Sequence, residues 1–417
     1  MDFKTDKRLR KLALGSSEKG DDIDTLLDVN DLTYSLPKNL SLASARNLKV
    51  FHAQRSAYTD GETSIIFTIQ TGAQFINFAG SSIQFKVQAT DVGSWSWGQG
   101  SAMNLFKEII VTSRSGQELC RLDKLNVYRL HQDRLNMSIE ELNSVGSLMG
   151  YSTDATPPVI APGDPAKKFI IPMNKLCGLF ASKKLMPQWL ASGMRIELRL
   201  EDKDVSFKAG TQITAYTISN PILSLDTFLL NDSASKKLNE ISARNGLEYV
   251  FKSHHAITDS FSTSSTNIDV NKAVSRALGA IAVSRKQSEI GAGNGDSLKS
   301  EAFVIDHSQW RLGSSYFPHQ PLQGIEEHYW NTLYTTEKLG STHPSSVTLT
   351  TYTSNFGVLS ANLERSNVLA HSGSPINNSI SLSLDARYSD THARQMVVFL
   401  EYVSIARVYL SNVTLLE

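Results

Sequence analysis

The most regular alternation of apolar and charged positions in the chain runs from Met194 to Glu201. Its apolar positions are Met194, Ile196, Leu198 and Leu200, and its charged positions are Arg195, Glu197, Arg199 and Glu201. Successive side chains of a β-strand point to opposite faces, so the pattern predicts a strand with one buried face. Burial of four such side chains contributes roughly 1.5–3 kcal/mol each, which is enough to fix the register of the strand.

The segment that leads into this strand, from Phe169 onwards, has a different pattern. Its apolar clusters are broken by Pro172 and Pro187, and they comprise Leu176, Leu179, Phe180, Leu185, Met186, Trp189 and Leu190. We interpret them as short turns or one-turn helices packed over the end of a β-sandwich. A capping turn that leads into a half-buried antiparallel strand is typical of an all-β protein.

Strand patterns recur along the rest of the chain. In the first half they lie at 64–70, 83–89, 109–111, 119–122 and 213–225, the last interrupted at Pro221. Residues 113–116 between two of them predict a hairpin turn. In the second half strands are predicted at 247–251, 277–283, 303–305, 347–353, 380–384 and 396–415. Short strands at this spacing indicate sandwiches or barrels.

Two helices and two loops are expected among these strands. Leu135, Ile139 and Leu142 fall on one helical face, with Ser138 and Glu141 as a capping box. Residues 232–244 have helical composition and end at a Gly246 that suits a C-cap. The four prolines of 156–165 indicate an extended surface loop, and 290–297 (IGAGNGDS) a flexible exposed loop.

The two halves of the chain also end alike. Leu200-Glu201 is followed by Tyr216 and Ser219-Asn220, and Leu400-Glu401 is followed by Tyr409 and Ser411-Asn412. Two tandem copies of one sandwich would produce this likeness, and chance similarity between two β-rich endings is the alternative. With the junction placed before the 232–244 helix, we predict an arm at 1–45 and domains at 46–230 and 231–417.

Composition narrows the class of protein. The 417 residues carry 41 basic and 41 acidic side chains, a balance that argues against a dedicated nucleic-acid binder. The apolar runs are shorter than the roughly 18 residues needed to cross a bilayer. The amino-terminal sequence has charges without an apolar core, so we expect no secretory signal. Cys120 and Cys177 are far apart in the sequence, which makes a disulfide framework an unlikely basis for the fold and favours folding inside a cell.

The predicted arm is a candidate for binding. Its basic residues are Lys4, Lys7, Arg8, Arg10 and Lys11, and an acidic run follows at 21–31. Charge blocks at chain ends are commonly interaction tails, so the arm is either a solvated tail or a partner-binding segment that becomes ordered on assembly.

Candidate catalytic and metal-binding groups are sparse, and we expect no enzyme, metal site or cofactor. Adjacent His254 and His255 on a strand would point to opposite faces and could not share a metal. Catalytic triads are assembled from separated positions, which argues against 306–308 (Asp-His-Ser). The glycines of 291–295 lack the helix that presents phosphate-binding amides. The tryptophans Trp95, Trp97, Trp189, Trp310 and Trp330 suit packing or interfaces better than sugar stacking.

Four stretches together resemble a known family. They are 100–122 (GSAMNLFKEIIVTSRSGQELCRL), 169–201, 311–322 (RLGSSYFPHQPL) with 326–329 behind it, and 355–384. Their order and spacing resemble the double jelly-roll major capsid proteins of DNA viruses, in the lineage of polinton-like viruses, virophages and adenovirus hexon. The resemblance covers most of the chain after about residue 45. It implies an all-β fold of two tandem eight-stranded jelly-roll sandwiches, with short helices in the loops.

The resemblance also implies a function. Members of the family form homotrimers whose six jelly rolls make a pseudo-hexagonal capsomer of an icosahedral shell. The implied partners are copies of the chain itself, penton and minor capsid or cement proteins, and an internal membrane or the genome at the arm; no small-molecule substrate is implied. The implied location is the virion capsid, assembled inside the host cell. Two alternatives stay open: a carbohydrate-binding or carbohydrate-cleaving β-sandwich, and a single jelly-roll capsid protein with a protruding domain.

Overall fold

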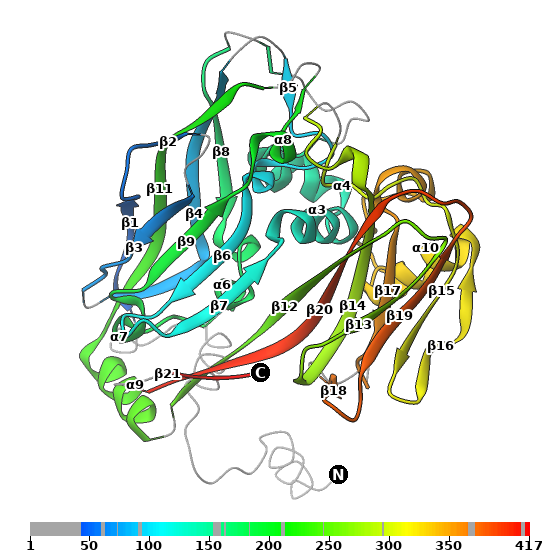
Figure 1. Cartoon of the computed structure of the whole chain (residues 1–417). Helices are drawn as coiled ribbons and strands as arrows, with labels where there is room; N and C mark the ends of the chain where they lie inside the picture. The colour runs from blue at the N-terminus through cyan, green and yellow to red at the C-terminus, as the bar shows by residue number, and fades with distance from the viewer. Residues whose placement is uncertain are drawn as a thin grey trace, which may run out of the picture.

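The computed structural model describes residues 43–59, 63–72, 74–90, 94–152, 160–161, 164–182, 184–209, 213–244, 246–293, 296–365, 372–409 and 413–417. These residues form two β-sandwiches that lie side by side, one at the left and one at the right of Figure 1. The first sandwich has a five-stranded and a four-stranded sheet, the second has a six-stranded and a four-stranded sheet, and every strand pairing within them is antiparallel.

The first sandwich contains sheets 1 and 2. Sheet 1 has the order β1 (Ala43–His52), β11 (Ala215–Leu230), β4 (Phe75–Thr90) and β8 (Lys167–Pro172), with β2 (Ala57–Thr59) on β11. Sheet 2 has the order β3 (Ser64–Thr68), β9 (Arg195–Leu200), β6 (Phe106–Thr112) and β7 (Glu118–Asp123). A separate two-stranded sheet joins β5 (Trp95–Ser96) and β10 (Lys208–Ala209).

The second sandwich contains sheets 3 and 4. Sheet 3 has the order β12 (Leu247–Phe261), β20 (Arg394–Val408), β14 (Val274–Lys286) and β17 (Val358–Asn362), with β18 (Ser374–Ile376) on β14 and β21 (Val413–Leu416) on β20. Sheet 4 has the order β13 (Ser265–Val270), β19 (Leu382–Tyr388), β15 (Ile305–Leu312) and β16 (Ser315–Gln323).

The strand order is the same in both sandwiches. In sheet 1, β1 pairs with β11 and β11 pairs with β4. In sheet 3, β12 pairs with β20 and β20 pairs with β14 in the same way. In sheet 2, β3 pairs with β9, and in sheet 4 β13 pairs with β19, which occupies the corresponding place in the chain. Eight strands in two sheets with these Greek-key crossings are a jelly roll. The chain is therefore an all-β double jelly roll, and the alternative of a single jelly roll with a protruding domain is wrong.

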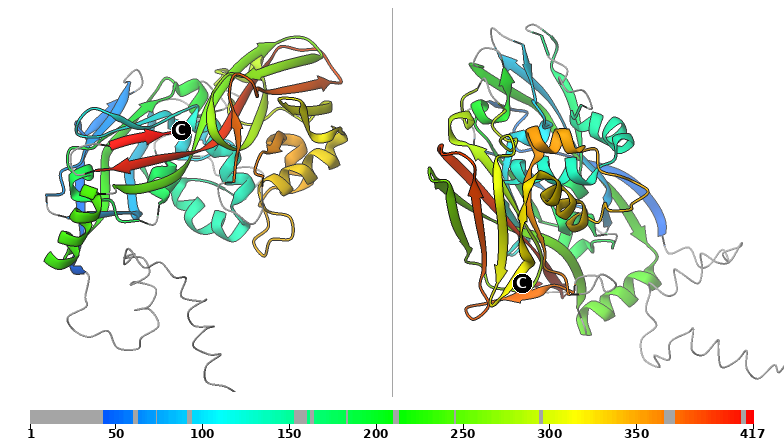
Figure 2. Two further views of the ribbon diagram at one scale, coloured as in Figure 1. Left: turned by 90° about the horizontal axis from the view of Figure 1, so that it is seen from below. Right: turned by 90° about the vertical axis from the view of Figure 1, so that its right-hand side faces the viewer.

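Short helices occupy the connections. They are η1 (Ala102–Leu105), α3 (Leu125–Asn136), α4 (Ile139–Glu141), η2 (Leu142–Gly146), α5 (Ser147–Met149), η3 (Met173–Lys175), α6 (Gly178–Ala181), α7 (Gln188–Ala191), α8 (Lys203–Ser206), α9 (Asp232–Arg244), η4 (Gln287–Glu289), α10 (Gly324–Thr335), α11 (Leu349–Thr351) and η5 (Tyr352–Phe356). The two views of Figure 2 place the helices around α3 beside those around α10. Hydrogen bonds from Ser346 to the carbonyls of Arg134 and Met137 connect the two groups.

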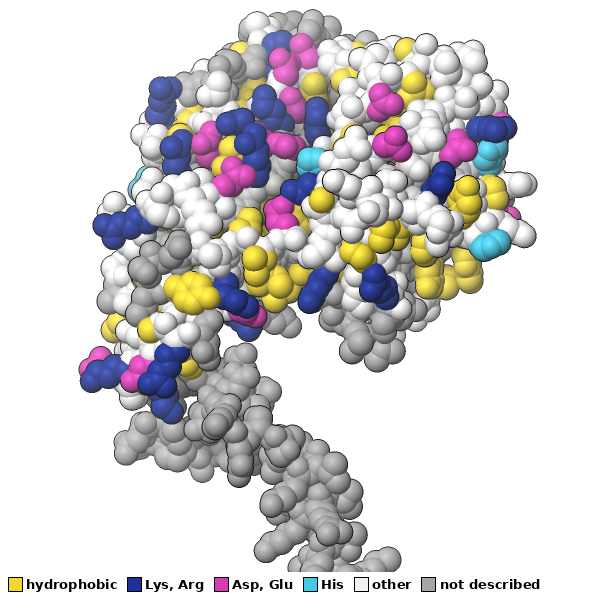
Figure 3. Space-filling view, turned by 60° about the horizontal axis from the view of Figure 1, so that its bottom comes forward, with side chains coloured by type: hydrophobic (Ala, Val, Ile, Leu, Met, Phe, Trp, Pro, Cys, Tyr) yellow, Lys and Arg dark blue, Asp and Glu magenta, His cyan; other side chains and the backbone are white. Residues whose placement is uncertain are grey.

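The strand predicted from the alternating pattern is confirmed as β9. Met194, Ile196 and Leu198 are fully buried, whereas Arg195 is exposed and Glu197 is partly exposed. On the outer face, charges alternate in sign along and across strands, and Arg199 binds Glu108 of β6 at 2.7 Å. Basic and acidic side chains are accordingly intermingled over the sandwich at the left of Figure 3.

Several local predictions are confirmed. Short helices η3, α6 and α7 precede β9, and β6 and β7 form the hairpin predicted around 113–116. Helix α9 ends before Gly246, whose φ of 73° is the left-handed conformation of a C-cap. The interruption at Pro221 is a bulge within β11, where the register shifts between Ser219 and Ile222 and Asn220 has a φ of 49°.

Two local predictions are wrong, and one helix has no counterpart among the predicted elements. The capping box of Ser138 and Glu141 is present, but it begins a new helix, so Leu135 is buried in α3 while Ile139 in α4 is 52% exposed. Residues 347–353 form α11 and the start of η5 instead of a strand, because Thr348 caps a helix at Thr351. Helix α10 was not predicted.

The matching endings of the two halves do not mark equivalent positions. Leu200 closes β9 in sheet 2, whereas Glu401 lies within β20 in sheet 3. The strand that corresponds to β20 by topology is β11. Ser411-Asn412 lies outside the described residues, as does most of the loop predicted at 156–165. The duplication therefore lies in the strand order and not in that sequence likeness.

Candidate functional site

The two sandwiches meet where β12 lies against β7 and α6. Gly178 at the start of α6 lies so close to the backbone of Lys252 that a Cβ atom would stand 2.0 Å from its carbonyl oxygen. The Tyr249 hydroxyl donates to the carbonyl of Leu185 at 2.8 Å. This contact therefore needs glycine at 178, and it holds backbone directly against backbone.

A polar cluster of one buried and three partly exposed side chains lies at the same junction. The Tyr128 hydroxyl donates to Oε1 of Glu401 at 2.8 Å, and Gln132 donates to the same oxygen. The His254 ring stacks on Tyr128 at 3.9 Å and its Nε2 donates to the carbonyl of Asp123 at 3.0 Å. Burial raises the pKa of Tyr128 well above its usual range and lowers the pKa of His254 to about 3. The phenol and the imidazole are therefore neutral at physiological pH.

A second link comes from the glycine-containing loop after β14. The Gly293 amide donates to the carbonyl of Asp204, and Gly293 accepts from the Ala209 amide, both at 3.2 Å. Asp296 is buried and accepts from the Gln99 amide at 2.6 Å. The expectation of a flexible exposed loop is wrong for these positions, because the loop is hydrogen-bonded to the first sandwich.

The hydrophobic core continues across the junction. One cluster includes the interior of the first sandwich and residues on one face of sheet 3, among them Ile281, Val283, Val397 and Phe399. A second cluster lies between sheets 3 and 4 and includes Ala280, Ala282, Met396, Val398 and Leu400. Neighbouring residues of β14 and β20 thus enter different cores, so sheet 3 is buried on both faces.

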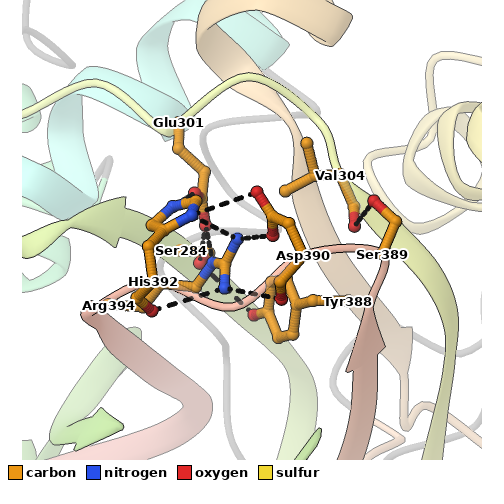
Figure 4. A network of polar contacts seen from close by, with 8 residues as sticks. All are labelled: Ser284, Glu301, Val304, Tyr388, Ser389, Asp390, His392 and Arg394. Carbon is orange, nitrogen blue, oxygen red and sulfur yellow. Dashed lines mark hydrogen bonds and ion pairs between the residues drawn. The ribbon is translucent and has the colours of Figure 1, made fainter. Parts of the chain in front are cut away.

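The densest charged network lies at the end of sheet 3 (Figure 4). Arg394 is fully buried, and its Nε donates to Oε1 of Glu301 at 2.8 Å. The same guanidinium pairs with Asp390 and lies 4.2 Å from the ring centroid of Tyr388. His392 reaches the second oxygen of Glu301 at 2.8 Å. Burial opposes ionisation of Asp390, but the hydrogen bond and charge of Arg394 outweigh it and lower its pKa.

This network is suited to holding chain segments together. Each of its charges has an opposite partner, which a buried ion needs to offset the loss of hydration. It connects the segment that bears Glu301 with the β19–β20 turn and, through the Ser284 hydroxyl, with β14. Sequence reasoning missed this network, because Glu301 lies 93 residues before Arg394 and no motif relates the two.

Residues 306–308 are placed so that Ser308 bonds a histidine from a distant segment. The Ser308 hydroxyl pairs with Nε2 of His328 at 2.8 Å instead of with the adjacent His307. Ser308 and His328 are each only 1% exposed, so no substrate can reach the hydroxyl. His328 lies in the unpredicted helix α10, and no sequence signal marked it as a partner.

The other candidate residues are also placed by the structure. His254 is buried at the junction and His255 is partly exposed, on opposite faces of β12. Among the described residues, no group of three or more His, Cys, Asp or Glu side chains could hold a metal. Cys120 and Cys177, distant in sequence, have their sulfur atoms 2.7 Å apart. The basic residues of the arm, Lys4, Lys7, Arg8, Arg10 and Lys11, lie outside the described residues.

The tryptophans do not form a sugar-binding groove. Trp95, Trp97 and Trp310 are buried, and Trp189 is partly buried against Phe75. Trp330 of α10 is 61% exposed. Stacking on a carbohydrate needs several exposed rings along one groove, so the structure does not support the carbohydrate-binding alternative.

Comparison with solved structures finds the same architecture in viral proteins. The Faustovirus major capsid protein has a TM-score of 0.60 and 9% identity, covering 96% of each chain. A chain of the Sputnik virophage cryo-EM structure has a TM-score of 0.63 and 9% identity, covering 92% of this chain and 90% of its own. The mavirus major capsid protein has a TM-score of 0.51 and 11% identity, covering 92% and 94%.

The sequence itself matches no family model and no curated protein. No helix in the described part of the chain is long and apolar enough to span a membrane. The strand order and the structural comparison agree over nearly the whole chain: it has the double jelly-roll fold that these viral structures share.

Proposed function

We propose that this chain is the major capsid protein of an icosahedral DNA virus and acts by self-assembly instead of catalysis. The observation that carries the proposal is the pair of jelly rolls with one strand order, matched along nearly the full length of viral capsid proteins. Burial of Ser308 and the pairing of the charges around Arg394 support a structural role for these side chains. We place the domains at 46–230 and 231–417, since each sheet draws its strands from one side of that boundary, although β1 begins at Ala43.

The proposed assembly unit is a homotrimer. Three chains with two jelly rolls each supply six similar bodies around one axis, which gives a near-hexagonal outline. Exposed apolar side chains support contacts between copies. One set lies on the helical connections, at Ile139, Val145, Leu148, Trp330, Tyr334, Leu339 and Leu349, and another lies on strands, at Leu48, Val50, Leu229, Val250, Tyr316 and Leu416. Obligate interfaces bury about 2,000–5,000 Å² and are more apolar than the remaining surface.

Light scattering on the purified full chain tests the trimer. We expect a particle of about 138 kDa, three times the 46.0 kDa of one chain. Trp330→Ser should shift the mass toward monomer, because it removes a large exposed ring from α10. Glu326→Ala, at an exposed charged position of the same helix, is the matched control and should stay trimeric. A monomeric wild-type protein at micromolar concentration and physiological salt would contradict the capsomer.

The arm is proposed to act in the shell, at a neighbouring capsomer, the genome or an internal membrane. Deletion of residues 1–40 removes no residue of β1, which begins at Ala43. The truncated protein should therefore still form trimers and fail to close shells, as seen by negative-stain microscopy. Loss of folding on truncation would show instead that the arm belongs to the core.

A further inference from the structure

The most informative unassigned feature is the pair of cysteines. Cys120 lies on β7, and Cys177 lies in the turn between η3 and α6. Their sulfur atoms are 2.7 Å apart although the residues are separated by 57 positions. Both side chains are almost completely buried. Two thiols held in contact on separate segments are the arrangement from which a disulfide forms with little movement of the backbone.

The surroundings of the two sulfur atoms differ. Hydrogen bonding with Cys177, followed by burial, raises the pKa of Cys120. Burial opposes ionisation of Cys177, but its contacts with Cys120, with the amides of Leu179 and Phe180 and with the charge of Arg129 outweigh it and lower its pKa. The thiolate is the nucleophilic form of cysteine, and the contact between the two sulfur atoms lets a product formed on one of them be attacked directly by the other.

A small oxidant can approach the pair. A cavity of about 210 Å³ lies beside Cys120 and is also lined by Arg121, His255 and Tyr402. Its volume is several times the roughly 30 Å³ that a water molecule occupies, so hydrogen peroxide fits.

We propose that Cys120 and Cys177 are a site of reversible oxidation to an intrachain disulfide. One thiol of the pair, as its thiolate, attacks one oxygen of hydrogen peroxide, and the O–O bond breaks to release hydroxide and leave a sulfenic acid on that cysteine. The sulfur of the other cysteine then attacks the sulfenic sulfur, its proton leaves with the sulfenic oxygen as water, and the S–S bond forms. In sum, two thiols lose two electrons and two protons, and one peroxide becomes two water molecules.

The bond would fasten the junction between the sandwiches. The turn that carries Cys177 continues into Gly178, which contacts the β12 backbone at Lys252. A link from this turn to β7 fixes both first-sandwich surfaces that β12 packs on. If the proposed capsid function holds, the chain would assemble with free thiols inside a reducing cell and become cross-linked in each subunit after release into oxidising surroundings.

The test uses the full chain, reduced, freed of reductant and treated with a small excess of hydrogen peroxide. We expect both thiols to disappear together in denaturing thiol titration, with a mass loss of about 2 Da for the two hydrogens removed. A proteolytic digest without reductant should contain a linked peptide pair bearing Cys120 and Cys177. The Tm should rise by roughly 5–10 °C and return after reduction, because the bond closes a long loop.

Single variants provide the matched control. Cys120→Ser and Cys177→Ser each retain one thiol and cannot form the intrachain bond, so peroxide should leave their Tm unchanged or lower it. Persistence of both wild-type thiols would overturn the proposal, as would oxidation with a mass gain of about 32 Da per sulfinic acid. These readouts do not depend on oligomeric state, so their failure is distinct from failure of the capsid proposal.

Discussion

Strands β9 and β20 are both interior strands of their sheets, yet their surroundings differ. In β9, buried Ile196 and Leu198 alternate with charged residues that face outward. In β20, Val397 faces the core shared with the first sandwich and Val398 faces the core between sheets 3 and 4. A strand with one wet face shows period-two alternation, whereas a strand buried on both faces shows a continuous apolar run.

This difference shows how the two sandwiches are joined: they share a hydrophobic core at their junction. The two sandwiches share a strand order, but β20 of sheet 3 packs against a core on each face, whereas the outer face of β9 carries partly exposed charged side chains. The continuous apolar run Met396–Leu400 is the sequence pattern that corresponds to burial of both faces of β20. The second sandwich is consequently covered by the first, and damage at the junction should affect both.

The largest effects are expected from aspartate placed at these strands. Val397→Asp and Val398→Asp should both give insoluble protein, since each places an unpaired carboxylate in a dry core at a cost of several kcal/mol, against a total stability of about 5–15 kcal/mol. In β9, Ile196→Asp should behave likewise. Glu197→Ala should remain soluble and change the free energy of unfolding by only about 0.5–1 kcal/mol.

Soluble yield and urea unfolding of the four variants check the comparison. A soluble, cooperatively folded Val397→Asp protein would show that the face of sheet 3 toward the first sandwich is wet. Equal damage from Ile196→Asp and Glu197→Ala would show that β9 is buried on both faces, as at a subunit interface.

Breaking the charged network of the second sandwich should have the next largest effect. Arg394→Met leaves the buried carboxylate of Glu301 without its main partner, which costs about 3–5 kcal/mol. The double variant Arg394→Met with Glu301→Gln removes both charges and should recover part of the loss. The measurement is the urea midpoint of each variant, and equal midpoints for the single variant and the wild type would contradict the structural role of the network.

Acid should weaken the junction through His254. The folded-state pKa is about 3, and the unfolded value is near 6.5, so between these pH values the unfolded chain binds a proton that the folded chain does not. Stability is therefore complete above pH 6.5 and falls as the pH decreases, by about 3 kcal/mol at pH 4 from this residue. His254→Gln should lose less stability than the wild type between pH 7 and 4 in urea unfolding; an equal loss would contradict this assignment.

The smallest of these effects is expected at the contact of α6 with β12. Gly178→Ala places a Cβ atom 2.0 Å from a backbone oxygen, and the necessary shift should cost about 1–3 kcal/mol. Gly146→Ala is the control, because its added Cβ meets only ordinary contacts of 3.4 Å or more. Calorimetry should show an unchanged Tm for the control and a lower or divided transition for Gly178→Ala. A wild-type transition in Gly178→Ala would contradict the close contact.

The sequence was informative where structure depends on neighbours along the chain. Period-two alternation located β9 with its correct buried face, Gly246 located the end of α9, and the 113–116 turn located a hairpin. The all-β class and the double jelly roll followed from such patterns together with the family resemblance.

The remaining features depend on contacts between distant segments. The Arg394 network, the Ser308–His328 pair and the contact of the two cysteines join residues that no local pattern relates. The β-branched residues of 347–353 predict a strand. The structure has a helix there, because the Thr348 side chain caps its amino terminus. The arm and the domain limits stay predictions.

The pairing of each sandwich's first and last long strands has a consequence for synthesis. Ala43 pairs with Leu230, so β1 has no β11 to pair with until almost 190 further residues have been translated. At about 5–20 residues per second this interval is roughly 10–40 s. Sheet 3 repeats the delay, because Leu247 pairs with Val408. Such non-local pairing folds slowly, and early strands with unpaired edges are prone to aggregate, so the nascent chain is a natural client for chaperones.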